Sequence, residues 1–118
     1  MSEVLNPADL EKAIQEISRR IHNGVRVVTD AETNAREKRR LYDHAYALAY
    51  IQHEGPAHEK RYAAEVSTTE QRKKAEDAEV VFRHAERNAR ALENELRATQ
   101  STGASIRAMY AGERGFGG

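Results

Sequence analysis

The chain has 118 residues, enough for one domain, and its 32% charged residues and two prolines are typical of long helices rather than of a sheet. The 19 basic and 19 acidic residues give a formal net charge of zero, which does not indicate nucleic-acid binding by charge alone and disfavours a strongly acidic DNA mimic. Because cysteine is absent, disulfides, thiolate zinc sites and cysteine nucleophiles are excluded.

The sequence shows no signal peptide and no apolar run near the roughly 20 residues that span a bilayer. We therefore expect a cytoplasmic protein without a membrane partner, in the host cytoplasm if a phage encodes it.

A first helix is predicted over about 7–54. Asn6 can cap its free N–H groups, Pro7 suits the first helical position, and Asp9 favours the positive helix end. Asn23-Gly24 is a candidate break, but the pattern crosses it in register, so we favour one continuous helix. The apolar positions, called the first stripe, recur at steps of three and four: Leu10, Ile14, Ile17, Ile21, Gly24, Val28, Ala31, Ala35, Lys38, Tyr42, Ala45 and Ala49.

A second helix is predicted over about 56–111, since Gly55 can end one helix and Pro56 can begin the next. Candidate breaks lie near 67–69 and 101–104, and we expect the helix to continue through 67–69. The Gly-rich residues 112–118 are expected to form a disordered, flexible tail. The second stripe is Ala64, Thr68, Gln71, Ala75, Ala78, Phe82, Ala85, Ala89, Leu92, Leu96, Thr99, Gly103, Ile106 and Tyr110.

These elements predict an all-α fold in which residues 1–111 form one long antiparallel helical hairpin. Each stripe is a narrow, heptad-like seam that cannot enclose a core alone. The sequence leaves open whether the seams close within one chain or between chains. We expect homo-oligomers, assembled through Phe82, Ala85, Ala89, Leu92, Leu96, Ile106, Met109 and Tyr110.

Basic residues cluster next to tyrosines on the first helix, as single-strand binding requires: cations for phosphates and rings for bases. Two further basic groups on the second helix would lie at the same level of a hairpin that turns near Gly55. The alternative interpretation is a solvated charged face. The candidate DNA-binding residues are Arg36, Lys38, Arg39, Arg40, Tyr42, Tyr46, Lys60, Arg61, Arg72, Lys73 and Lys74.

No catalytic pattern is present in the sequence. We find no nucleophile–base pair and no Gly-rich phosphate loop, and the five histidines lack the spacing of a zinc motif. We therefore expect a protein that is not an enzyme and needs no metal or cofactor.

The C-terminal part, Leu92-Glu93-Asn94-Glu95-Leu96 followed by 98–110, resembles phage recombination mediator proteins of the UvsY kind. In that family a helical leucine stretch leads into a small, polar Ser/Gly segment and ends in a basic, apolar turn with an aromatic. The earlier order of basic cluster, tyrosines and Gly-containing turn is also similar, and it matches the family's DNA-contacting cluster with Lys38, Arg39 and Arg40.

This resemblance implies a small helical protein that forms rings, binds single-stranded DNA, and contacts a recombinase and a single-strand binding protein. Its function would be to promote loading of the recombinase onto DNA covered by that binding protein. The alternative is a non-enzymatic helical adaptor or scaffold of a phage or bacterial assembly, with its charged faces solvated.

Overall fold

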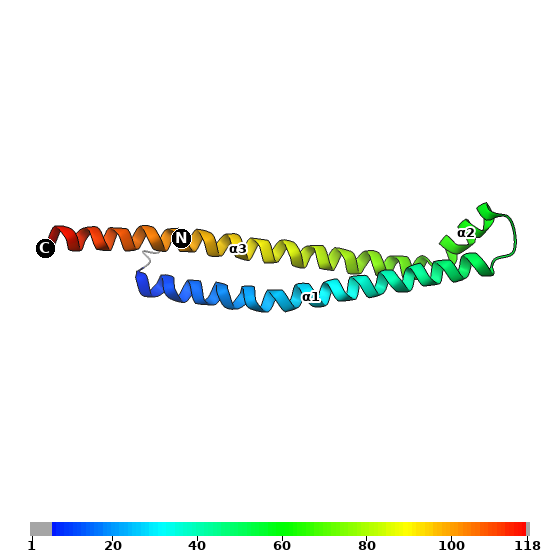
Figure 1. Cartoon of the computed structure of the whole chain (residues 1–118), viewed down its shortest axis with the longest axis horizontal. Coiled ribbons are helices and arrows are strands. Elements are labelled where there is room, and N and C mark those ends of the chain that lie inside the picture. The colour runs from blue at the N-terminus through cyan, green and yellow to red at the C-terminus, as the bar shows by residue number, and fades with distance from the viewer. Residues whose placement is uncertain (1–5, 118) are drawn as a thin grey trace. The chain divides into compact units, whose positions relative to one another are not determined.

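The computed structural model describes the backbone of residues 6–117 and the side chains of residues 6–112. It contains α1 (Pro7–Gln52), α2 (Ala57–Ser67) and α3 (Thr69–Gly117), and no strand among those residues, so the all-α prediction is confirmed (Figure 1). None of the described helices is both long and apolar enough to cross a membrane. The chain divides into two packed units: unit 1 holds the described parts of Met1–Arg26 and Arg87–Gly118, and unit 2 is Val27–Glu86.

The start of α1 follows the predicted cap. The backbone N–H of Asp9 donates to Asn6 Oδ1 at 2.9 Å, and the N–H of Leu10 donates to the Asn6 carbonyl at 3.1 Å. These bonds use donors that the first turn of a helix otherwise leaves without a partner. Pro7, which has no N–H to satisfy, is the first helical residue.

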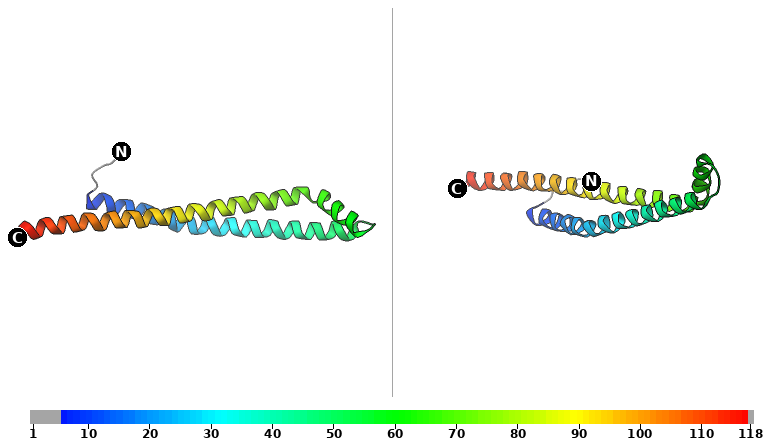
Figure 2. Two further views of the ribbon diagram at one scale, coloured as in Figure 1. Left: turned by 90° about the horizontal axis from the view of Figure 1, so that it is seen from above. Right: turned by 45° about the vertical axis from the view of Figure 1, so that its right-hand side comes forward.

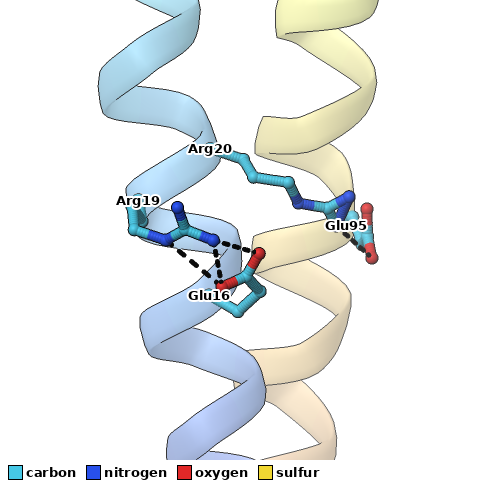
Figure 3. A network of polar contacts seen from close by, with 4 residues as sticks. All are labelled: Glu16, Arg19, Arg20 and Glu95. Atoms are coloured by element: carbon cyan, nitrogen blue, oxygen red, sulfur yellow. Dashed lines mark hydrogen bonds and ion pairs between the residues drawn. The ribbon is translucent and has the colours of Figure 1, made fainter.

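In unit 1, the first turns of α1 lie beside the part of α3 around Gly103 (Figure 1). Leu10 and Ile17 of α1 are buried, and a Cβ on Gly103 of α3 would lie 4.0 Å from Leu10 Cδ1. Further along, Arg20 forms an ion pair with Glu95 at 3.6 Å between the two helices (Figure 3). Arg20 follows Leu10 along α1, whereas Glu95 precedes Gly103 along α3. The two segments therefore run antiparallel.

In unit 2, α1 packs against α3 through alanines, and Figure 2 shows the two helices side by side. Ala35 of α1 and Ala75, Ala78 and Ala85 of α3 are buried, while Ala64 of α2 has no exposed surface. Because alanine ends at Cβ, such a seam lets the helix backbones approach closely, but it buries little apolar area per residue. The core of this unit is therefore thin.

The turn between α1 and α2 is built around Gly55, whose φ of +142° lies in the region that favours glycine. Pro56 is the N-cap of α2 rather than its first helical residue, and its carbonyl accepts from the N–H groups of Glu59 and Lys60 at 3.0 and 3.1 Å. The predicted turn thus lies at the expected position, and the flanking helices end and begin within two residues of the expected bounds.

The expected continuity through 67–69 is wrong, because α2 ends at Ser67 and α3 begins at Thr69. Thr68 is buried, and both its N–H and its Oγ1 donate to the Ala64 carbonyl, at 3.2 and 2.6 Å. The hydroxyls of Ser67 and Thr69 bond to carbonyls of the same turn. Hydroxyls that compete for carbonyls in this way favour a break. These hydroxyls bond to carbonyls in the last turn of α2.

The other candidate breaks are not breaks in the structure. Helix α1 passes through Gly24, as we favoured, and α3 passes through residues 101–104. The expected flexible tail after Ala111 is also not observed, since α3 continues through Gly117, and Gly118 lies outside the described residues.

In the single chain, most of the second stripe lies against other parts of the same chain, and the expected homo-oligomer stays a prediction. Every member of the first stripe, and every member of the second from Ala64 to Ile106, is buried or half-buried in the single chain. The proposed interface residues Phe82, Ala85, Ala89, Leu92, Leu96 and Ile106 are among them. Met109 and Tyr110 are the two members of the expected interface that are exposed, by 66% and 45%.

A glycine exchange tests the helical course of α1. A Cβ at Gly24 would meet nothing within 4 Å, so Gly24→Ala should stabilise the protein by about 0.5–1 kcal/mol through helix propensity. At Gly55 the same exchange places a Cβ against the Glu59 carboxylate at a positive φ, so it should destabilise by about 1–3 kcal/mol. Urea unfolding measures both variants, and a loss of stability in Gly24→Ala would contradict an unbroken α1.

An acid titration tests the contact between Glu16 and Arg19 (Figure 3). Hydrogen bonds from Arg19, 2.7 Å long, lower the pKa of Glu16 below its usual 4.5. This contribution is complete above pH 4.5 and is lost as the pH falls through the lower folded-state pKa. Unfolding by urea between pH 3 and 7 should therefore show a shallower acid slope in Glu16→Gln than in wild type. Glu93→Gln is the control, because Glu93 is exposed and has no ion pair among residues 6–112; an identical slope in both variants would contradict the assignment.

A size change tests the packing of α2. Ala64 is fully buried, so Ala64→Leu should overpack unit 2 and destabilise it by about 1–3 kcal/mol. Ala57→Leu adds the same atoms at an exposed position of the same helix and should cost far less. Thermal unfolding of the two variants gives the comparison, and equal melting temperatures would show that α2 does not dock through Ala64.

Candidate nucleic-acid interface

The basic cluster of α1 lies on one wall of a groove in unit 2. This arginine groove has a volume of about 720 Å³ and a floor that includes the buried Ala35 and Ala75. Because both floor residues are alanines, the space between the helix flanks stays open. The lining residues are Ala35, Arg36, Arg39 and Arg40 of α1, and Ala75, Glu76 and Glu79 of α3.

The opposite wall of the groove is acidic, which differs from the expected convergence of two basic clusters. Glu76 pairs with Arg72 at 3.5 Å and Glu79 pairs with Arg83 at 2.9 Å, both along α3. Lys73 and Lys74 are exposed but do not line the groove. Equal spacing from the turn at Gly55 places the basic segment of α1 beside the predicted segment of α3. It does not specify which side of α3 faces the arginines.

The three arginines are held loosely. Arg36 pairs with Glu32 at 2.9 Å and Arg39 with Asp43 at 3.4 Å, in pairs whose side chains are 39–72% exposed. Arg40 has no ion pair within 4.0 Å among residues 6–112. Exposed pairs of this kind contribute only about 0.2–1 kcal/mol, so a polyanion could replace the carboxylates at little cost.

Lys38, which the sequence grouped with these arginines, has a different environment. It occupies a position of the first stripe and is half-buried, where its aliphatic stem can pack while the ammonium reaches solvent. A role in packing therefore accounts for the position of Lys38.

The tyrosines of α1 form a contiguous row. Tyr42 and Tyr46 meet edge to face with ring centroids 6.2 Å apart, and Tyr46 and Tyr50 stack at 6.5 Å. All three side chains are half-buried. The guanidinium of Arg39 lies 5.6 Å from the Tyr42 centroid, and the ammonium of Lys60 lies 5.7 Å from that of Tyr50. A cation thus lies at each end of the row, in the geometry of cation–π contacts.

Lys60 and Arg61 of α2 have distinct environments. Lys60 is half-buried, and its Nζ also lies 3.5 Å from the Tyr50 carbonyl, near the negative end of α1. It therefore stabilises the turn. Arg61 is exposed, donates to Tyr62 Oη at 3.4 Å, and lies 5.1 Å from the Tyr62 ring centroid. That hydrogen bond raises the pKa of Arg61 above its usual value, so the side chain stays charged.

Sequence reasoning missed Tyr62 and left Tyr50 out of the site, although Tyr50 continues the four-residue spacing of Tyr42 and Tyr46. Tyr62 directly follows the basic pair Lys60-Arg61, and that adjacency was the available signal. Among residues 6–112, no group of three or more His, Asp or Glu side chains is arranged to hold a metal ion.

No protein-family model matches this chain, and no curated protein or solved structure resembles it significantly.

Proposed function

We propose that the protein binds single-stranded DNA through one flank of unit 2 and acts as a recombination mediator of the phage type. The observation that carries the proposal is the cation–tyrosine flank: Arg36, Arg39 and Arg40, next to the row of Tyr42, Tyr46 and Tyr50, with Arg61 beyond it. The cations can bind phosphates and the aromatic rings can stack on unpaired bases. A single strand offers both groups, whereas in a duplex the base faces are stacked on one another and cannot be reached.

The charge balance restricts how the strand lies. Residues Val27–Glu86 include twelve acidic and ten basic residues, so the net charge of unit 2 does not attract DNA. Attraction of phosphates is therefore confined to the cation–tyrosine flank. Glu76 and Glu79 would repel phosphates from the far wall of the arginine groove. The strand therefore follows the α1 wall, with its phosphates at the arginines and its bases directed towards the tyrosines and α2.

The mediator role rests on the resemblance of residues 92–110 to the UvsY kind. In this proposal α1 pairs with α2 and α3 as one antiparallel hairpin, and copies associate to multiply a weak site by avidity. Since the second stripe packs within the chain, association uses exposed apolar side chains instead. Those available are Leu41, Leu48, Val80, Val81, Met109 and Tyr110.

A second candidate, a helical adaptor or scaffold, is favoured by the same exposed apolar side chains. Val80 and Val81 are adjacent and exposed by 64% and 59%, and Ile51 and Val66 by 72% and 76%. In that case a protein partner would cover these side chains, and the arginines would be solvated surface charges.

A matched pair of triple variants distinguishes the two candidates. Replacing Arg36, Arg39 and Arg40 with alanine should weaken binding of a labelled 30-nucleotide strand about tenfold or more at 50 mM salt. The same change should reduce the slope of log affinity against log salt by about 2, because up to three phosphate contacts are lost. Lys38 is kept, since removing it would disturb the stripe. Fluorescence anisotropy measures affinity and slope.

The control replaces Arg87, Arg90 and Arg97, which removes the same charge from unit 1 and should change affinity less than about threefold. Equal weakening by both triple variants would show that only net charge matters, and absence of binding by wild type at low salt would favour the adaptor. For a mediator, wild type but not the unit 2 variant should also speed recombinase ATPase activity on DNA covered by single-strand binding protein.

A further inference from the structure

Tyr62 differs from the other tyrosines of unit 2 in what its ring can still contact. Tyr42, Tyr46 and Tyr50 are half-buried, contact one another and carry cations at the two ends of their row. Tyr62 is 56% exposed, and no second ring lies against it among the described residues. Its ring therefore offers more free surface than any ring of the row.

One face of the Tyr62 ring is occupied by a charge. The Arg61 guanidinium lies 5.1 Å from the centroid, and its Nη2 hydrogen bonds to the Tyr62 hydroxyl at 3.4 Å. A single contact uses one of the five N–H donors of arginine, so the others remain free for a phosphate. The arrangement thus presents an open aromatic face and an uncommitted cation side by side.

The backbone under this pair is fixed by packing. Tyr62 lies two residues before the fully buried Ala64, and the carbonyl of Ala64 accepts hydrogen bonds from buried Thr68. Lys60, two residues before Tyr62, lies 5.7 Å from the Tyr50 ring centroid, which connects α2 to the tyrosine row of α1. The exposed ring therefore projects from an anchored helix close to the row, and little ordering is needed when a ligand binds.

We infer that Tyr62 is the base-stacking residue of the proposed single-strand site, with Arg61 on one ring face and an unpaired base on the other. This inference rests on the proposed function and names the contact that recognises bases. Arg61 holds the phosphate next to the stacked base, and the row of Tyr42, Tyr46 and Tyr50 supports the strand from below. Because every base has a π-face, such a contact selects single strands without selecting sequence.

A fluorescent replacement tests the stacking directly. The protein has no tryptophan, so Tyr62→Trp introduces a unique indole at the site. Binding of a 30-nucleotide oligo-dT strand should quench its emission, whereas inorganic polyphosphate, which has charges but no bases, should leave it nearly unchanged. Ala91→Trp is the control, since Ala91 is exposed and belongs to unit 1. Equal quenching of both indoles, or quenching by polyphosphate, would overturn the inference.

Affinity provides the second measurement. Tyr62→Leu should weaken binding of the strand about tenfold, Tyr62→Phe should stay within about twofold of wild type, and Ala91→Leu, at an exposed position of unit 1, should have no effect. Far-UV circular dichroism shows that the variants remain helical. If oligo-dT binds but Tyr62→Leu binds equally well, the inference fails and the proposed function stands. If wild type binds no strand at low salt, both fail together.

Discussion

Close contact between small side chains is the interaction on which the rest of this structure depends. In unit 2 the buried apolar residues are the alanines at 35, 64, 75, 78 and 85, while unit 1 buries Leu10 and Ile17, and Leu10 lies near Gly103. An alanine seam contributes little hydrophobic free energy per residue, so it must be long and well matched to hold two helices together. A thin seam also leaves most of each helix surface exposed to solvent or to partners.

The small size of the core limits which surfaces can bind a partner. The residues of the first stripe, and of the second as far as Ile106, are buried or half-buried in the single chain, so little of their surface is free. What remains outside the seams is a charged surface with scattered apolar side chains such as Leu41, Leu48, Val80 and Val81. Any binding function must be built from these flanks, and the flank of α1 in unit 2 is the one that combines cations with aromatic rings.

The ion pairs of Arg36 and Arg39 on that flank are weak and can be replaced by other anions. Arg36 and Arg39 bond to carboxylates one helical turn away, and Arg61 bonds to the neighbouring Tyr62. Local, exposed contacts of this kind hold side chains in place in the absence of a ligand but contribute little stability, so an anion can take the place of the carboxylates. Lys60 is different, because its contacts with Tyr50 join α1 to α2 and its side chain is half-buried.

The sequence by itself determined which residues face inward, because helical periodicity is a local property. Every position of the first stripe, and the second stripe as far as Ile106, is buried or half-buried, and the Asn6 cap and the turn at Gly55 were readable from single residues. Tertiary structure decided what those faces meet. In unit 2, Glu76 and Glu79 rather than lysines line the groove opposite the arginines, and α2 ends where buried Thr68 bonds back to Ala64. These outcomes depend on the register and rotation of the packed helices and on which atoms lie within bonding distance. The spacing of residues along the chain does not specify any of these.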